Sequence, residues 1–197
     1  MKGGYFMRDY VNMNENEIDE NLLKKEKIDG IIYLMAPPKR EHRDVQYNIA
    51  SIFNNYFKQN KKRCIARFED QLDIDDDGYV VPDIMVFCYN NSKDIPLIVI
   101  EVLSNSTRER DLGVKMEKYA KLGIKEYWIV TWETFSIDIY LLTDENKYKL
   151  YKSYSYSALN TPKRRGEDTE PEPAKEFSPV SVPELKVQLE DVFYFVE

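Results

Sequence analysis

Apolar residues return along the chain with two different periods, and these periods predict where helices and strands lie. A helical period spans Glu41 to Phe57, where apolar residues return every three to four positions on one face. These residues are Val45, Ile49, Ile52, Phe53, Tyr56 and Phe57. A second helix is predicted from about Thr107 to Leu122. Ser106 and Glu109 would form a capping box at its start, and Gly123 would end it.

Short apolar runs bounded by turn residues predict the strands. They are Ile31–Met35, Cys64–Ile74, Gly78–Cys88, Pro96–Leu103, Lys125–Trp132, Ser136–Leu142 and Lys147–Ser157. The run Pro96–Leu103 is apolar on both faces apart from one carboxylate, so this strand belongs in the middle of a sheet that is covered on both sides. Strands interleaved with helices predict an α/β fold, with a mixed β-sheet flanked by α-helices.

Three segments depart from this pattern. Residues 1–25 are polar and rich in Asn and Glu, and we expect a loosely attached arm or short helices there. Residues 157–176 combine Pro with charges of both signs and almost no apolar residues, which predicts a flexible insert. Apolar residues return in 177–197, so we expect this segment to pack back on the core. A chain of 197 residues with 43% hydrophobic content suits one domain, 1–197.

Composition excludes some classes of protein. No segment approaches the run of about 18 apolar residues that a membrane span needs, so we expect no membrane partner and a cytoplasmic location. The net charge of −7 argues against broad coating of nucleic acid by basic residues, although it leaves room for a local basic groove. Cys64 and Cys88 are too few for a disulfide scaffold, and we expect them to be buried, reduced thiols.

The carboxylate inside the central strand is Glu101. In an extended strand it shares one face with Val99 and Leu103, while the other face is also apolar. Burying an ionised carboxylate without a partner is very costly, so a cation, hydrogen-bond donors or a raised pKa must compensate.

Asp83 supplies a second carboxylate from the preceding strand. Asp83 and Glu101 are equidistant from Ser92, so an antiparallel hairpin centred there would set them opposite each other. Facing carboxylates repel, and a divalent cation with a preference for oxygen ligands relieves this repulsion. The pair therefore predicts a site for Mg²⁺ or Mn²⁺.

Lys115 is the candidate third member of this site. Rotation of about 100° per residue turns its stem toward the core, on the side that also carries Arg108. A lysine there could position a water and stabilise negative charge on a phosphate, and Arg108 could bind the substrate. Two alternatives stay open: Lys115 extends past the core into water, or Glu101 forms a buried salt bridge with Lys115 or Arg108.

The chain also resembles a known family. The segments "IDGIIYLMAPP", "REHRDV", "VVPDIMVF", "PLIVIEVLSNSTRERDLGVKMEKYAKLGIKEYWIV" and "PELKVQLEDVF" look like the bacterial Uma-type family of putative restriction endonucleases. That family is placed in the PD-(D/E)XK nuclease-like superfamily. The similarity runs from about Asp9 to Phe193, and it implies a restriction-endonuclease-like fold and metal-dependent hydrolysis of DNA.

The resemblance also implies roles for single residues. Pro82-Asp83 matches the PD element, and Glu101 matches the acidic position of the (D/E)XK element. Leu103 stands where the superfamily lysine would be, which leaves Lys115 as the candidate for a lysine moved onto the next helix. The single histidine, His42, matches the family histidine and is a catalytic candidate, although capping or hydrogen bonding explains it equally well.

Other acidic and basic residues are weaker candidates. Glu41, Glu69 and Asp70 could come near the site, depending on the register. The turn "DIDDDG", residues 73–78, mimics the opening of a calcium loop, but Ile84 replaces the closing Glu and strands flank it, so a solvated acidic turn is the better interpretation. We interpret the basic runs at 58–63 and 163–165 as surface segments whose side chains are exposed to solvent.

Residues and resemblance together predict a metal-dependent DNA phosphodiester hydrolase. A homodimer would suit cleavage of both strands, by analogy alone. The alternatives are a catalytically weak or inactive nuclease-like binding module, and a structural or interaction protein in which Glu101 only forms a buried salt bridge.

Overall fold

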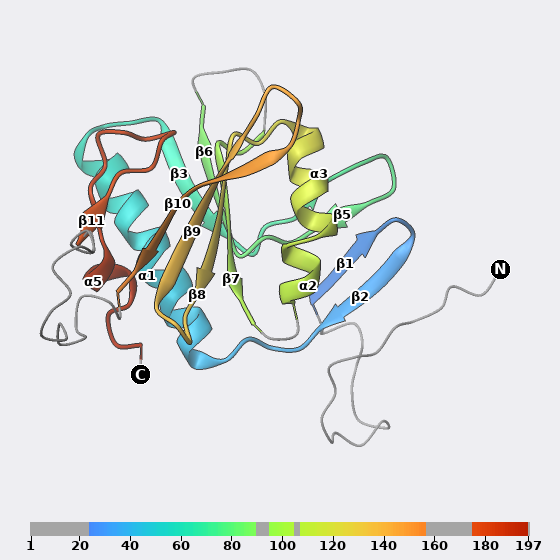
Figure 1. The fold of residues 1–197 in the computed structure, drawn as a ribbon, viewed down its shortest axis with the longest axis horizontal. Helices are drawn as coiled ribbons and strands as arrows, with labels where there is room; N and C mark the ends of the chain where they lie inside the picture. The colour runs from blue at the N-terminus through green and yellow to red at the C-terminus, as the bar shows by residue number, and fades with distance from the viewer. Residues whose placement is uncertain (1–23, 90–94, 105–106, 157–174, 197) are drawn as a thin grey trace, which may run out of the picture.

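The structure is a computed structural model that describes residues 24–89, 95–104, 107–156 and 175–196. A six-stranded sheet forms its centre, in the order β10-β9-β8-β7-β6-β3 (Figure 1). Its strands are β3 (Cys64–Phe68), β6 (Ile84–Cys88), β7 (Ile98–Leu103), β8 (Glu126–Thr131), β9 (Ser136–Leu142) and β10 (Tyr148–Ser155). Only β7 and β8 are parallel, and the other neighbours are antiparallel. The predicted mixed sheet is confirmed, with β7 inside it and β10 at one edge.

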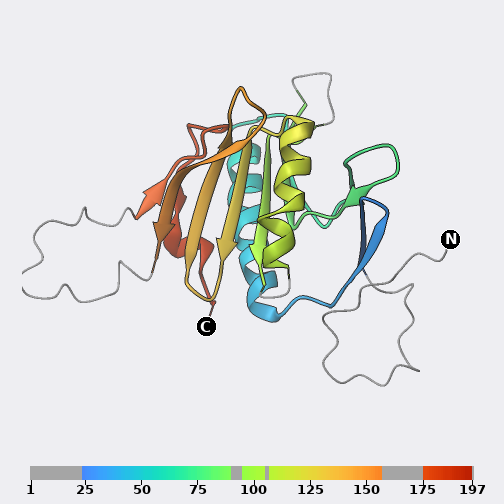
Figure 2. The same ribbon diagram turned by 45° about the vertical axis from the view of Figure 1, so that its right-hand side comes forward.

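Helices cover both faces of this sheet, as the sequence predicted. Helix α1 (Arg40–Gln59) lies on one face, and the shorter helices α2 (Arg108–Asp111) and α3 (Val114–Leu122) lie on the other (Figure 2). The two faces of β7 divide the apolar core accordingly. Ile100 and Val102 pack with residues of α1, whereas Val99 and Leu103 pack with Tyr119 of α3. None of the helices in the described ranges is long and apolar enough to cross a membrane.

A second, smaller sheet lies beside α2 and α3. It has the order β2-β1-β5-β4 and consists of β1 (Lys24–Ile28), β2 (Ile31–Met35), β4 (Leu72–Asp73) and β5 (Tyr79–Val80). The predicted strand Cys64–Ile74 therefore divides between two sheets, and so does Gly78–Cys88. Lys24 and Lys25 belong to strand β1, not to an N-terminal arm, and residues 1–23 lie outside the described residues.

The predicted helix from Thr107 to Leu122 is interrupted. Between α2 and α3, Gly113 lies so close to the preceding turn that a Cβ there would be 2.7 Å from the Glu109 carbonyl oxygen. Thr107 is the N-cap of α2 and makes no side-chain cap bond, while Ser106 of the expected capping box lies outside the described residues. Gly123 ends α3 with a positive φ of 80°, as predicted.

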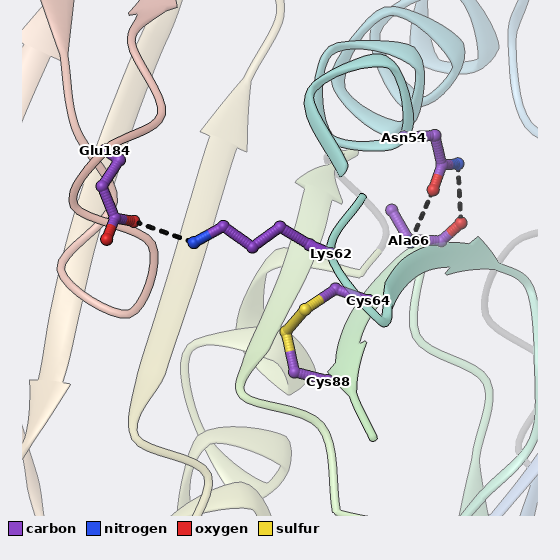
Figure 3. The surroundings of a disulfide bond; sticks show 6 residues. All are labelled: Asn54, Lys62, Cys64, Ala66, Cys88 and Glu184. Carbon is purple, nitrogen blue, oxygen red and sulfur yellow. Dashed lines mark hydrogen bonds and ion pairs between the residues drawn. A yellow bond between two sulfur atoms is a disulfide. The ribbon is translucent and has the colours of Figure 1, made fainter. Parts of the chain in front are cut away.

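The expectation of reduced, buried cysteines is wrong. Cys64 and Cys88 are partners in the β3–β6 register, with Cα atoms 4.0 Å apart, and they form a disulfide (Figure 3). Both cysteines are half-buried, Cys64 on the edge strand β3 and Cys88 at the end of β6. Their chain separation of 24 residues hid this pairing, since it depends on which two strands lie side by side.

Two side-chain contacts hold the chain around this edge. Asn54 of α1 bonds both the N–H and the C=O of Ala66, so the helix satisfies backbone groups that an edge strand would leave unpaired (Figure 3). Lys62 forms an ion pair of 3.7 Å with Glu184 of the C-terminal segment.

The C-terminal segment contains β11 (Glu176–Phe177), β12 (Val187–Gln188) and α5 (Leu189–Val192). Its apolar residues are buried in the same cluster as α1: Phe177, Val182, Leu185, Val187, Leu189, Val192, Phe193 and Val196. The fully buried Glu126 of β8 accepts hydrogen bonds from the backbone of Val180 and Ser181 and from Trp128. Most of the predicted insert, residues 157–174, lies outside the described residues.

Candidate active site

Asp83 and Glu101 meet where β6 begins. The β6–β7 register pairs Ile84 with Ile100, so the next position sets Asp83 opposite Glu101. The backbone N–H of Asp83 donates to Glu101 Oε2 at 3.2 Å, and the N–H of Val102 donates to Asp83 Oδ2 at 2.8 Å. Both acids are buried, with exposed fractions of 6% and 2%. The structure thus brings together the two carboxylates that the sequence singled out.

Helix α1 surrounds Asp83 with two further side chains. His42 Nε2 lies 3.1 Å from Asp83 Oδ2, and Gln46 Nε2 donates to Asp83 Oδ1 at 3.0 Å. Burial raises the pKa of Asp83, but the hydrogen bond and charge of His42, together with the charges of Lys24 and Lys115, lower the pKa overall. Burial lowers the pKa of His42, and the contact with Asp83 outweighs it in turn and raises that pKa. Asp83 is therefore ionised at neutral pH.

Glu101 has a different environment on the α3 side. Lys115 Nζ lies 2.8 Å from Glu101 Oε1, and the Tyr119 hydroxyl donates to the same oxygen at 2.7 Å. Burial raises the pKa of Glu101 to about 8, and the nearby carboxylates Asp111 and Asp83 add to the rise, against the lowering effect of Lys115. The pKa of Asp83 is thus lowered and that of Glu101 is raised, although the two acids lie opposite each other. Perturbed pKa values of this kind are typical of functional sites.

Lys115 is enclosed by carboxylates. Its Nζ lies 2.8 Å from Glu101, 2.9 Å from Glu26 and 3.1 Å from Asp111, and its side chain is 1% exposed. Burial lowers the pKa of Lys115, but these three carboxylates outweigh burial and raise the pKa well above its usual value. The lysine does not extend into water, so that alternative is excluded. The buried Glu101–Lys115 contact of the other alternative is present, whereas Arg108 is exposed.

Sequence reasoning missed several members of this group: Lys24, Glu26, Gln46, Asp111 and Tyr119. Local signals existed for three of them. Gln46 follows His42 by one helical turn, and Asp111 and Tyr119 stand one turn on either side of Lys115. No comparable signal pointed to Glu26, because β1 belongs to the smaller sheet and its contact with α3 is decided by packing.

The weaker acidic candidates lie at different places. Glu69 is near the site, with its carboxylate 3.9 Å from Lys24 Nζ, whereas Asp70 pairs with Arg67. Asp70 also lines a cavity of about 320 Å³ near Phe87 and Tyr89, at the end of β6 away from Asp83. His42, not Glu41, is the residue of the first α1 turn that contacts Asp83.

The acidic turn 73–78 is neutralised by lysines. Asp75 pairs with Lys118 at 2.8 Å, and Asp77 pairs with Lys27 at 2.6 Å. These contacts suit the interpretation of the turn as a solvated connection between β4 and β5.

The donor set at Asp83 and Glu101 fits a hard divalent cation. Within the described ranges, no group of three or more His, Cys, Asp or Glu side chains is arranged to hold a metal ion. Mg²⁺ is commonly held by one or two carboxylates together with waters and substrate phosphate oxygens. Two opposed carboxylates, one of them ionised, meet that requirement.

Comparison with known proteins gives concordant results. Residues 7–173 match the model of the Uma2 family, described as putative restriction endonuclease. An uncharacterized protein from Synechocystis is 27% identical over 133 residues, which are 64% of this chain and 70% of that protein. The crystal structure of a putative nuclease from Anabaena variabilis has a TM-score of 0.65 at 18% identity, and the match covers 92% of this chain and 96% of that one. At this identity, the structural likeness shows the fold.

Proposed function

The chain belongs to the Uma2 family of putative restriction endonucleases, and from that premise we propose that it hydrolyses DNA phosphodiester bonds with the help of a divalent metal ion. The observation that carries this proposal is the pair of buried carboxylates, Asp83 and Glu101, which lie opposite each other at the start of β6. A buried acidic pair next to a lysine and a histidine is costly to maintain for stability alone.

Asp83 and Glu101 are the residues that would hold Mg²⁺ or Mn²⁺. When bound, the ion supplies polarisation of the phosphate and a more acidic water. Hydrolysis forms a bond from the water oxygen to phosphorus and breaks the bond from phosphorus to the leaving oxygen. One water proton passes to that oxygen by way of solvent, which balances the reaction.

His42 and Gln46 orient Asp83 in this proposal. Each donates to a different oxygen of the carboxylate, so one face of α1 holds both oxygens of Asp83. The contact with Asp83 raises the pKa of His42, which favours a proton on Nε2 toward Asp83. Residues that orient ligating groups in this way influence metal affinity although they do not bind the ion.

Lys115 and Tyr119 hold the second carboxylate. Both donate to Glu101 Oε1, which leaves Oε2, bonded to the Asp83 backbone, on the side of the acidic pair. We assign Lys115 to positioning Glu101, since its ammonium is enclosed. Arg108, exposed at the start of α2, is the proposed contact for DNA phosphates outside the site.

A binding module without turnover is the second candidate. The position of the superfamily lysine is occupied by the buried Leu103, and Lys115 is engaged with three carboxylates. Such a protein would bind metal and DNA at the same place and release the DNA uncut.

We also propose a cytoplasmic location and a homodimer. Both proposals rest on DNA being the substrate.

Plasmid nicking and Mn²⁺ calorimetry test the proposal together. The protein is compared with Asp83→Asn and Glu101→Gln, which keep size and shape, and with the control Asp73→Asn in the exposed acidic turn. We expect metal-dependent nicking in the wild type and control, and its loss together with weaker Mn²⁺ binding in the two site variants. Metal binding without nicking in the wild type would favour the binding module. Equal nicking by all variants would exclude the acidic pair as the active site.

A further inference from the structure

Because Lys115 is enclosed by carboxylates, another residue must stabilise the negative charge on the phosphate in the proposed reaction. An ammonium group has three N–H donors, and Lys115 Nζ has three carboxylate neighbours between 2.8 and 3.1 Å. To reach a substrate phosphate it would have to leave a buried ion pair. Negative charge that builds up on the phosphate therefore needs another donor.

Arg110 does not supply this donor. Its Nε lies 3.6 Å from Glu26 Oε2, its guanidinium packs 4.7 Å from the centre of the Tyr33 ring, and its side chain is 14% exposed. Arg110 thus contacts Oε2 of Glu26, while Lys115 contacts Oε1 of Glu26 and also Glu101, so Arg110 is engaged with Glu26 and Tyr33.

Lys24 differs from both residues. Its Nζ lies 3.7 Å from Asp83 Oδ1 and 3.9 Å from Glu69 Oε1, too far for hydrogen bonds to either acid. The Lys24 side chain is 21% exposed, and within the described part of the chain it donates no hydrogen bond. Its N–H groups are thus available to a ligand beside Asp83.

Strand β1 directs Lys24 toward this place. Alternate residues of a strand share a face, so Lys24 lies on the same face as Glu26 and Ile28, both of which are buried. Lys25 and Lys27 lie on the opposite face, and Lys27 pairs with Asp77 of the acidic turn. The same strand that completes the surroundings of Lys115 therefore also presents an accessible ammonium to Asp83.

We propose that Lys24 is the lysine that contacts the scissile phosphate, through an N–H donated to a non-bridging oxygen. The assignment rests on the proposed function and divides the work of one superfamily lysine between two residues. Lys115 positions Glu101 inside the protein, and Lys24, from the other sheet, stabilises the charge on the substrate.

The test compares Lys24→Met with Lys25→Met. Methionine keeps the aliphatic stem and removes the charge, and Lys25 is the neighbouring lysine on the opposite face of β1. At saturating plasmid with Mn²⁺, we expect nicking by Lys24→Met to fall about 100-fold, with Mn²⁺ affinity and melting temperature close to those of the wild type. In Ca²⁺, the slope of log Kd for DNA against log salt should decrease by about one for Lys24→Met only. Lys24→Arg should retain part of the rate.

The outcomes separate this assignment from the proposed function. Nicking by Lys24→Met within threefold of the wild type would overturn the role of Lys24 and leave the proposed function intact. If the wild type does not nick DNA, the proposed function fails, and an unchanged salt slope for Lys24→Met would then overturn the phosphate contact as well. Loss of Mn²⁺ binding or of folding in both Lys24→Met and Lys24→Arg would show a structural partner of Asp83 and also overturn the assignment.

Discussion

The backbone N–H of Asp83 donates to the side chain of Glu101, and the N–H of Val102, next to Glu101, donates to the side chain of Asp83. Each acid thus bonds the backbone of the other's strand. This reciprocal arrangement fixes the two carboxylates relative to each other. It gives the site a preformed geometry, and it predicts how the site responds to substitution and pH.

Removal of the buried ammonium should destabilise the protein strongly. Lys115→Met leaves Glu26, Glu101 and Asp111 without their shared cation, and loss of one partner from a buried ion pair costs about 3–5 kcal/mol. The control Lys118→Met removes a lysine that pairs with the exposed Asp29 and Asp75, for which we expect a much smaller loss of stability. Urea denaturation measures both. Equal losses for the two variants would contradict the role of Lys115 as the central cation.

The raised pKa of Glu101 predicts a pH dependence of stability in the metal-free protein. The folded state holds a proton on Glu101 up to about pH 8, whereas the unfolded chain releases it near the ordinary value of 4.5. Folding binds a proton between these values, so the free energy of unfolding should fall as pH rises from 4.5 to 8, by at most about 1.4 kcal/mol per pH unit for this group.

Denaturation at pH 5, 6.5 and 8 in EDTA measures this slope. Glu101→Gln is the matched variant, because its amide cannot titrate, and it should remove much of the fall. His42 contributes in the same direction, since its pKa is also raised in the folded state. Asp83, whose pKa is lowered, contributes stability above its ordinary pKa that is lost in more acidic solution. A stability that rises steadily from pH 5 to 8 would show that Glu101 is ionised in the folded protein.

His42→Ala should weaken metal binding without abolishing the fold. His42 holds one oxygen of Asp83 at 3.1 Å, and loss of a residue that orients a metal ligand reduces affinity about 10- to 100-fold. Arg43→Ala, at the exposed neighbouring position of α1, serves as the control. Mn²⁺ calorimetry on both variants gives the comparison, and equal affinities would remove His42 from the site.

The Cys64–Cys88 bridge should contribute to stability in oxidising solution. A disulfide closing a loop of this size is worth about 3 kcal/mol through the unfolded state. Cys88→Ser should therefore unfold at lower urea concentration than the oxidised wild type, and a reductant should remove most of the difference. Alkylation followed by mass spectrometry, with and without reductant, reports the thiol state. Two modified cysteines in the unreduced folded protein would show that the bridge is absent.

The sequence by itself determined the parts of this protein that depend on short-range pattern. The apolar period of 41–57 predicted α1, and the two apolar faces of Pro96–Leu103 predicted a central strand, because burial on both sides leaves no polar face. The meeting of Asp83 with Glu101 was also predictable. They lie on consecutive strands, and an antiparallel hairpin fixes its register through the turn.

Only the tertiary structure decided which groups surround these acids. Glu26 and Lys24 come from a separate small sheet, and the disulfide joins an edge strand to β6, so each contact depends on how distant segments pack. The position of Lys115 was decided in part by Gly113, where a close approach to Glu109 separates α2 from α3 and sets the start of the helix that carries the lysine. Periodicity describes which face a residue occupies, but the partner on that face is chosen by the packing of the whole chain.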